Sequence, residues 1–317
     1  MGQVLKHMSM VVNQSMPPKP TWGIDNIPDL SGKIVIVTGG NTGIGRETVK
    51  ALLTKNATVY LAARNKQKSE TTIQELKEAT GKEAKFLELD LSELKKVKQS
   101  AEEFLSKEKE LHILFNNAGV MIPPIEQLTA DGYDLQFGTN VLGHFYFTKL
   151  LLPVLTSTAE SSPERSVRVV TTSSSGHIFW GSNIRYDTLR DSPERKKLGT
   201  QMLYCQSKSG NILFARELAR RYADKGIVST SLNPGNIKSD LQRHTSKIQE
   251  LLIAPMLYPT PMGALTQLYV GTAPEAREMN GKYFIPWARV GEARSESLDS
   301  KAAEQLWDWL EDQVKNV

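Results

Sequence analysis

The sequence predicts an α/β fold in which one doubly wound, Rossmann-type parallel sheet forms a single domain. The first observation is a β-branched run at residues 33–37 that ends in a glycine-rich turn and leads into an amphipathic stretch. The second is that strand-like runs and helical patterns then alternate along the chain, which is typical of a parallel sheet covered by helices on both faces. No repeat, low-complexity tract or linker divides the chain, so residues 31–317 are expected to form one domain.

The expected strands and helices follow one another closely. We predict strands at residues 33–37, 58–63, 85–89, 111–115, 167–172, 227–232 and 284–285, and helices at 66–79, 94–107, 133–152, 204–222 and 302–314, besides the one that follows the glycine turn. Ligands of doubly wound sheets bind beyond the carboxyl ends of the strands. The residues that directly follow each strand are therefore the first candidates for a functional site.

The first strand is followed by Gly39, Gly43 and Gly45, and this spacing differs from the usual G-x-G-x-x-G pattern. A strand, a glycine turn and a helix in this order present backbone N–H groups and the positive end of a helix to an anion. The sequence therefore predicts a phosphate-binding turn, although a glycine turn on its own is often only a turn. The candidate residues are Gly39, Asn41, Thr42, Gly43, Ile44 and Gly45.

The second strand ends at Arg64 and Asn65. At this point of a dinucleotide-binding unit, an acidic residue binds the ribose hydroxyls of NAD, whereas a basic residue accommodates the 2′-phosphate of NADP. Arg64 therefore favours NADP(H). The alternative is an ordinary surface arginine at the start of a charged helix.

Tyr204 and Lys208 lie four residues apart in an expected helix, so they share one face. A phenol titrates near 10, and its use as an acid–base group at neutral pH requires a shift of about three units. An ammonium about 4 Å away supplies roughly the 4 kcal/mol that such a shift needs. The pair is a candidate catalytic unit, although Tyr and Lys at this spacing also occur on ordinary solvated helix faces.

The composition limits the classes of partner and compartment. The 39 Lys and Arg and 35 Asp and Glu leave a net charge of +4 without a basic block, which argues against a nucleic-acid partner. No apolar run approaches the roughly 18 residues that a membrane-spanning helix needs. Cys205 is the only cysteine, which suits a reducing compartment, so we expect a cytoplasmic protein. We also expect no metal site. Residues 1–30 are expected to form an irregular arm because of Pro17, Pro18, Pro20 and Pro28.

Several motifs occur in one fixed order and together resemble the short-chain dehydrogenase/reductase family over about residues 30–290. They are Thr38-Gly39 with Gly43-Ile44-Gly45, Asn116-Asn117-Ala118-Gly119, Asn140, Ser174, Tyr204 with Lys208, and Pro234-Gly235. Ile27-Pro28-Asp29-Leu30 and Ala62-Ala63-Arg64 are most similar to the retinol-dehydrogenase-like branch. The resemblance implies a nicotinamide cofactor, and for this branch NADP and apolar carbonyls or alcohols.

The resemblance also implies a role for each of four candidate catalytic residues. Tyr204 would protonate the developing alkoxide, while Ser174 would hydrogen-bond the same oxygen. Lys208 would lower the pKa of the tyrosine and bind the nicotinamide ribose, and Asn140 would anchor a water that replaces the proton. Ser173 is the alternative to Ser174 if the register is shifted by one.

Further cofactor contacts are implied by position in the family pattern. The glycine turn would hold the pyrophosphate, Asp90 the adenine amino group, and the backbone near Asn117 the adenosine ribose. The strand-six turn would flank the nicotinamide. The residues concerned, besides Arg64, Asn65 and the glycine turn, are Asp90, Leu91, Asn117, Ala118, Gly119, Tyr204, Lys208, Pro234, Gly235 and Ile237.

The chain departs from the family pattern between Ser174 and Tyr204, which lie farther apart than in many relatives. The extra stretch, around residues 177–199, is expected either to shape a substrate mouth or to cover the helix faces on which relatives dimerise. Both a monomer and a homodimer therefore remain open. Residues 241–263 are expected to form a substrate lid, with Met256, Tyr258 and Trp287 as apolar contacts unless they belong to the core.

The leading hypothesis is an NADP(H)-dependent oxidoreductase that interconverts a hydrophobic aldehyde or ketone and the corresponding alcohol. One alternative is a catalytically retired member that binds the dinucleotide and acts as a redox-sensing interaction protein. Loss of the tyrosine or the lysine would mark such a protein, and both are present. Another alternative is reduction of a carbon–carbon double bond on the same scaffold.

Overall fold

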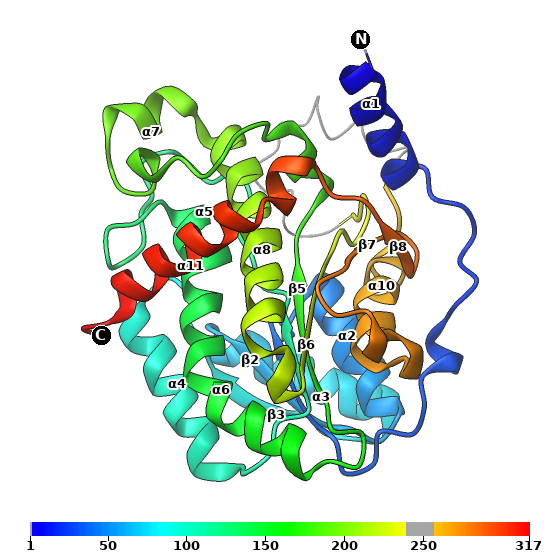
Figure 1. Ribbon diagram of the computed structural model, residues 1–317. Helices are drawn as coiled ribbons and strands as arrows, with labels where there is room; N and C mark the ends of the chain where they lie inside the picture. Colours follow the sequence, from blue (N-terminus) through cyan, green and yellow to red (C-terminus); the bar gives the residue numbers. More distant parts are fainter. Residues whose placement is uncertain (1, 239–256) are drawn as a thin grey trace.

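The computed structural model describes residues 2–238 and 257–317 (Figure 1). In this part of the chain eight strands form one sheet in the order β3-β2-β1-β4-β5-β6-β7-β8, and all neighbours are parallel except β7 and β8. The predicted doubly wound α/β fold is therefore confirmed. The strands are β1 (Ile34–Thr38), β2 (Thr58–Ala63), β3 (Lys85–Glu88), β4 (Ile113–Asn116), β5 (Val167–Thr172), β6 (Ile227–Leu232), β7 (Tyr283–Ile285) and β8 (Arg289–Gly291).

Helices cover both faces of the sheet (Figure 1). The helices on one face are α2 (Gly43–Thr54), α3 (Lys66–Thr80) and α10 (Thr260–Thr272), and those on the other are α4 (Leu94–Lys107), α6 (His144–Ser161), α8 (Thr200–Tyr222) and α11 (Ser300–Val314). Side chains of β1 alternate between the two cores, because Val35 and Val37 join one and Ile36 the other. A strand buried on both faces reads as a continuous apolar run, which is why the sequence located the central strands.

The antiparallel edge strand β8 was not predicted. Its three residues, Arg-Val-Gly, carry no apolar run, and Val290 is 53% exposed. The strand exists because the chain turns back after β7, and Phe284 pairs with Val290 across the ladder. Its position depends on this long-range pairing, which the local sequence does not reveal.

The predicted helix at 133–152 is divided into three parts. A short helix, α5 (Leu135–Phe137), is capped by Asp134 and continues into a π-helical turn, Gly138–Gly143, before α6 begins. A π-turn keeps apolar side chains on the buried side much as an α-helix does, so the sequence pattern does not distinguish the two. Such turns are frequent at functional sites, and this one contains Asn140.

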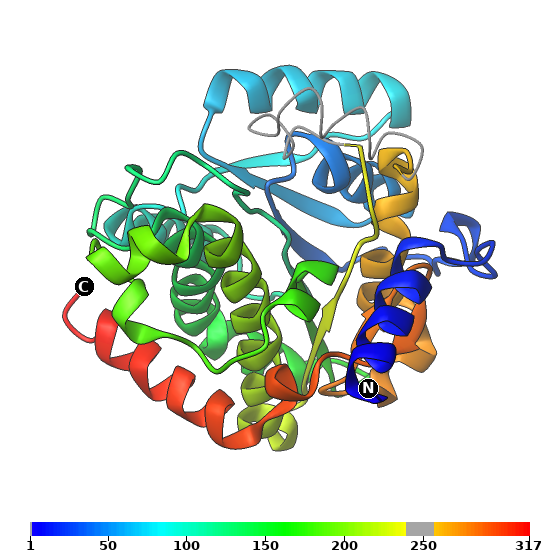
Figure 2. The same ribbon diagram turned by 90° about the horizontal axis from the view of Figure 1, so that it is seen from above.

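The prediction of an irregular arm at residues 1–30 was wrong for its first half. Helix α1 (Gly2–Ser15) lies beside the segment that carries β8, as Figures 1 and 2 both show. Met10 and Gln14 are buried on this side, and Arg289 donates to the side-chain oxygen of Asn13. The helix has no acidic residue in its first turn and no basic residue in its last, so the usual end signals are missing. Packing against the body of the protein explains it instead.

The insertion between Ser174 and Tyr204 is folded in short pieces: η3 (Ser175–Phe179), η4 (Tyr186–Thr188) and α7 (Pro193–Leu198).

None of the helices in the described residues combines the length and the apolar character that a membrane-spanning helix needs.

An aromatic cluster fastens α11 to the helices beneath it, and its contribution to stability is testable. The ring of Phe145 is fully buried, with its centroid 5.1 Å from that of Trp307 and 6.0 Å from that of Phe214. We expect Phe145→Ala to lower the free energy of unfolding by about 3–5 kcal/mol, measured by urea denaturation. Phe179→Ala is the matched control, because this ring is 60% exposed, and it should change stability by less than about 0.5 kcal/mol. Equal effects of the two substitutions would contradict the assignment of this core.

Candidate active site

A cavity of about 860 Å³ lies at the carboxyl ends of the parallel strands. It spans the ends of β1 and β4, where the strand order reverses, as is typical of dinucleotide sites. The structure brings together most of the predicted site residues in its lining: Gly39, Asn41, Thr42, Gly43, Ile44, Gly45, Arg64, Asn65, Asp90, Leu91, Asn117, Ala118, Gly119, Ser174, Tyr204, Lys208, Pro234, Gly235 and Ile237.

Two of the predicted substrate contacts, Tyr258 and Trp287, are not among the residues that line this cavity. Tyr258 and Trp287 pack edge-to-face with their ring centroids 5.0 Å apart, and Trp287 is a buried member of the core. Leu257 lines the cavity instead. Met256 and most of the predicted lid at 241–263 lie outside the described residues, and from Thr260 the chain already forms α10. The sequence cannot separate an aromatic residue in a pocket wall from one in the core, because both need the same apolar side chain.

Gly39 and Gly45 approach each other so closely that the turn has no room for side chains. A Cβ on Gly45 would lie 2.2 Å from the carbonyl oxygen of Gly39, and Gly39 itself has a φ of +67°. Helix α2 begins at Gly43, and the first N–H groups of a helix lack intrahelical acceptors. The turn therefore fits a pyrophosphate, as the sequence predicted.

Thr38, the last residue of β1, joins the glycine turn to the loop after β4. Its Oγ1 accepts hydrogen bonds from the backbone N–H groups of Asn117 and Ala118, both at 2.9 Å, and lies 2.9 Å from Nε2 of His144. Burial lowers the pKa of His144 to about 4, so its ring is neutral at pH 7. Nδ1 of the neutral ring donates a hydrogen bond to the carbonyl oxygen of Asn140 at 3.0 Å. Nε2 is therefore the unprotonated nitrogen and accepts a hydrogen bond from the Thr38 hydroxyl.

The end of β2 places two cationic side chains, Arg64 and Lys68, along the cavity. Asn65 caps α3, since its side-chain oxygen accepts from the backbone N–H of Lys68 at 2.8 Å. At the end of β3, Oδ1 of Asp90 accepts from the backbone N–H of Ser92 at 2.9 Å and from its hydroxyl at 2.6 Å. Lys68 and Ser92 were not predicted, although both lie within a few residues of predicted positions.

Tyr204 and Lys208 lie in α8 and line the cavity, where Lys208 is buried and Tyr204 is partly exposed. Burial raises the pKa of Tyr204 to about 12, although a hydrogen bond with Ser174 acts in the opposite direction. Burial also lowers the pKa of Lys208 to about 8. The ammonium donates to the carbonyl oxygen of Thr172 at 3.1 Å and lies 5.8 Å from the centroid of the tyrosine ring. The raised pKa of Tyr204 reflects its burial, and the lowering of that pKa by Lys208 stays a prediction.

Asn140 is fully buried behind Gly119 and does not line the cavity. Its side chain accepts from the backbone N–H of Val120 at 2.8 Å and donates to Val120 O and to Oγ of Ser207, both at 3.0 Å. A Cβ on Gly119 would lie 3.1 Å from Oδ1 of Asn140 and 3.6 Å from Nζ of Lys208, so these two groups converge there. The role of Asn140 as a water anchor stays a prediction.

The two serines after β5 point to different partners. Ser173 is buried and donates to the backbone oxygen of Lys208 at 2.6 Å, whereas Ser174 lies beside Tyr204. His177 holds the turn, because its Nδ1 donates to Ser174 O at 2.6 Å and its Nε2 accepts from the N–H of Arg294 at 3.2 Å. Burial lowers the pKa of His177 to about 4, which keeps the ring neutral and suits both bonds.

Gln14 of α1 reaches the same turn through buried contacts. Its Oε1 accepts from Nδ2 of Asn233 at 3.0 Å and from the hydroxyl of Tyr283 at 3.3 Å, and that hydroxyl lies 3.4 Å from Nδ1 of His177. Asn233 immediately precedes the predicted nicotinamide-flanking turn. Neither Gln14 nor His177 was predicted, since only contacts between segments distant in sequence reveal their positions.

Comparisons with known proteins agree with this geometry. A family model described as short chain dehydrogenase matches residues 33–187. A short-chain dehydrogenase/reductase of Armillaria gallica is 56% identical, over 96% of this chain and 98% of that protein. The chain belongs to the short-chain dehydrogenase/reductase family. Retinol dehydrogenase 12 of Homo sapiens is 39% identical over 88% of this chain and 85% of that protein, which supports the predicted branch of the family.

Solved structures of similar fold include short-chain dehydrogenase/reductase relatives with a bound cofactor. An uncharacterized protein from Mycobacterium paratuberculosis aligns with a TM-score of 0.71 and 29% identity, over 93% of this chain and 97% of that chain. RhlG of Pseudomonas aeruginosa, in a complex with NADP, aligns with a TM-score of 0.64 and 25% identity, over 81% and 95%. Family membership makes the protein an oxidoreductase of CH–OH or C=O groups with a nicotinamide dinucleotide cofactor, and the glycine turn fits that group.

The burial of the Lys208 ammonium predicts that this side chain lowers the stability of the fold. We expect Lys208→Met to raise the free energy of unfolding at pH 7 by up to about 3 kcal/mol, since a charged group leaves the interior. The carbonyl oxygen of Thr172 keeps a donor, Nδ2 of Asn211 at 3.0 Å. Because the pKa is about 8 in the folded chain and 10.5 ordinarily, the cost of the ammonium is complete below pH 8 and disappears as the pH rises to 10.5.

Urea denaturation of both proteins at pH 7 and pH 10 measures this difference. The advantage of the variant should shrink at the higher pH, and Lys301→Met, at an exposed position, should show no such change. An advantage that is the same at both pH values would show that the buried charge is not its source.

Proposed function

We propose that this protein is an NADP(H)-dependent oxidoreductase that interconverts a hydrophobic aldehyde or ketone and the corresponding alcohol. The observation that carries the proposal is that Ser174, Tyr204 and Lys208 line the same cavity as the glycine turn. A dinucleotide whose pyrophosphate is bound at that turn would extend toward these three side chains. A hydroxyl group and an ammonium group at this place could donate a proton and hydrogen bonds to the carbonyl oxygen of a substrate.

In the reducing direction the chain supplies position and a proton, while the bound nicotinamide supplies the hydride. Tyr204, with a pKa of about 12, is protonated at pH 7 and donates its proton to the developing alkoxide. Ser174 hydrogen-bonds the same oxygen and stabilises its charge. Lys208, with a pKa of about 8, stays largely charged at pH 7 and binds the ribose hydroxyls.

The preference for NADP(H) is supported by the charge at the end of β2. Among the described residues, the cavity lining at 62–68 contains the cations Arg64 and Lys68, and the nearest acidic lining residue is Asp90 after β3. These two cations would attract the 2′-phosphate of NADP. At the end of β2 there is no carboxylate at residues 64 and 65 to bind the ribose hydroxyls of NAD.

A hydrophobic substrate is supported by the part of the cavity beyond the glycine turn. The loop after β4, the start of α5 and the segment after the undescribed residues contribute mainly apolar side chains to it. Gln127 and Gln201 add two amides at its edge. The apolar lining residues are Val120, Met121, Ile122, Pro123, Leu135 and Leu257.

The tyrosine role predicts the outcome of one substitution. Tyr204→Phe keeps the ring and removes the proton donor, so kcat for reduction of apolar aldehydes and ketones should fall by about 10²–10⁴-fold. The measurement is the loss of NADPH absorbance against a panel that includes enones, with product analysis. Tyr222→Phe, in the last turn of the same helix, is the control and should keep wild-type activity. Tight NADPH binding without turnover of any panel member would favour a nucleotide sensor, and products reduced only at C=C would favour an enone reductase.

The cofactor preference rests on Arg64 and is tested separately. Arg64→Asp places a carboxylate where ribose hydroxyls of NAD would bind and repels a 2′-phosphate, so the ratio of kcat/KM for NADPH to that for NADH should fall at least about tenfold. Arg165→Asp, on the loop before β5, is the matched control. An unchanged ratio in the Arg64 variant would show that this strand end does not select the cofactor.

A further inference from the structure

The loop after β4, residues 120–127, forms one wall of the cavity, and we call it the substrate wall. Its residue Ile122 has a φ of +51°. A β-branched residue in the left-handed region is a true conformational outlier. Such strain persists only where the surrounding structure holds the backbone in place, and it is concentrated at functional sites.

Three side chains hold the backbone of the substrate wall. Oε1 of Gln136 accepts from the N–H of Ile122 at 2.9 Å, and Oγ1 of Thr200 donates to the carbonyl oxygen of Pro123 at 2.8 Å. Nη2 of Arg195 donates to the carbonyl oxygen of Gln127 at 3.0 Å. The wall is therefore held at its strained residue and at two points that follow it.

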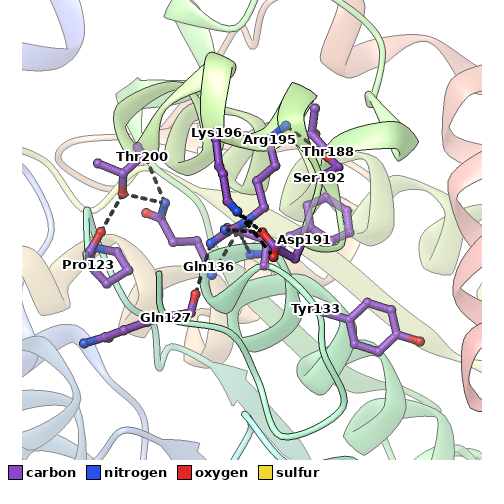
Figure 3. Close-up of polar contacts among 12 residues, drawn as sticks. Pro123, Gln127, Tyr133, Gln136, Thr188, Asp191, Ser192, Arg195, Lys196 and Thr200 are labelled. Carbon is purple, nitrogen blue, oxygen red and sulfur yellow. Dashed lines mark hydrogen bonds and ion pairs between the residues drawn. The ribbon is translucent and has the colours of Figure 1, made fainter. Parts of the chain in front are cut away.

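Two of these side chains, Gln136 and Thr200, are also bonded to each other (Figure 3), and Arg195 is bonded to Asp134, which caps α5. Nε2 of Gln136 donates to the backbone oxygen of Thr200 at 2.8 Å and lies 3.3 Å from its hydroxyl. Oδ2 of Asp134 accepts from Nε of Arg195 at 3.0 Å, and its Oδ1 accepts from the N–H of Phe137 at 2.9 Å. The result is one polar network beneath the wall.

The network is buried, and Arg195 ties the insertion into it. The side chains of Arg195 and Asp134 are each only 2% exposed. Arg195 belongs to α7, and Thr200 follows directly after the insertion as the first residue of α8. A buried ion pair is poor evidence for stability, because desolvation offsets much of the attraction. The Arg195–Asp134 ion pair instead fixes the position of α7 against the substrate wall.

We propose that Gln136, Arg195 and Thr200 are positioning residues that hold the substrate wall in its strained shape, and that the insertion thereby sets which carbonyl substrates fit. This inference rests on the proposed function and extends it to substrate selection by shape. Of the two roles considered for the insertion, it favours the substrate mouth. The three residues contact backbone atoms of the wall and do not line the cavity themselves.

The mechanical part of the proposal is tested by amide hydrogen exchange, which requires no activity. In Gln136→Met and Thr200→Val, the peptide that covers residues 120–127 should exchange about tenfold faster than in wild type, because one anchor of the wall is lost. Thr188→Val is the matched control. Thr188 is a buried threonine of the insertion whose hydroxyl donates to the carbonyl oxygen of Arg185 and accepts from Nε2 of Gln206. Unchanged exchange at 120–127 in both variants would overturn the proposal.

The selection part is tested with a bulky and a small apolar aldehyde. In Gln136→Met and Thr200→Val the ratio of kcat/KM for the two aldehydes should change about fivefold, while the dissociation constant for NADPH stays within about twofold of wild type. A uniform loss for both aldehydes, or faster exchange with an unchanged ratio, would overturn selection by the wall. If the wild type reduces neither aldehyde, the proposed function fails, and the exchange result alone then decides whether the wall is held.

Discussion

The hydroxyl of Thr38 is the contact on which the arrangement of the site depends. Its oxygen accepts hydrogen bonds from the backbone N–H groups of Asn117 and Ala118, and the hydroxyl donates a hydrogen bond to the neutral, buried His144. These bonds fix together two loops at the point where the strand order of the sheet reverses. The glycine turn lies on one side of this junction, and Asn140 lies on the other through His144. A dinucleotide cavity between β1 and β4 requires these two loops to stay at a constant separation.

The same burial that organises the site determines its acid–base properties. Tyr204 and Lys208 are withdrawn from water, which moves the pKa of the phenol upward and that of the ammonium downward. At neutral pH the phenol is thus protonated, and the Lys208 ammonium, 5.8 Å from the centroid of the tyrosine ring, remains largely charged. This state suits reduction, in which the enzyme gives a proton to an oxygen that is gaining charge.

The central strands, the glycine turn and the clustered motifs could be predicted from the sequence, because each has a local signal: a β-branched run, a glycine spacing or a helical interval. Helix α1, the π-turn around Asn140 and β8 could not be predicted, since packing or a distant strand produces them. His177, Gln14 and Arg195 were missed for the same reason. Arg195 reads as part of a charged surface run in the sequence, yet it is one of the most deeply buried side chains in the part of the chain described by the structure.

The most direct test of the account is the fate of the hydride. The wild-type protein is given NADPH deuterated at nicotinamide C4 and the best carbonyl substrate of the panel, and the product is examined by NMR. The account predicts deuterium on the carbinol carbon and a primary isotope effect when hydride transfer is rate-limiting. Deuterium on the β-carbon of a product that keeps its carbonyl, or no deuterium in any product, would contradict hydride transfer to a C=O group at this site.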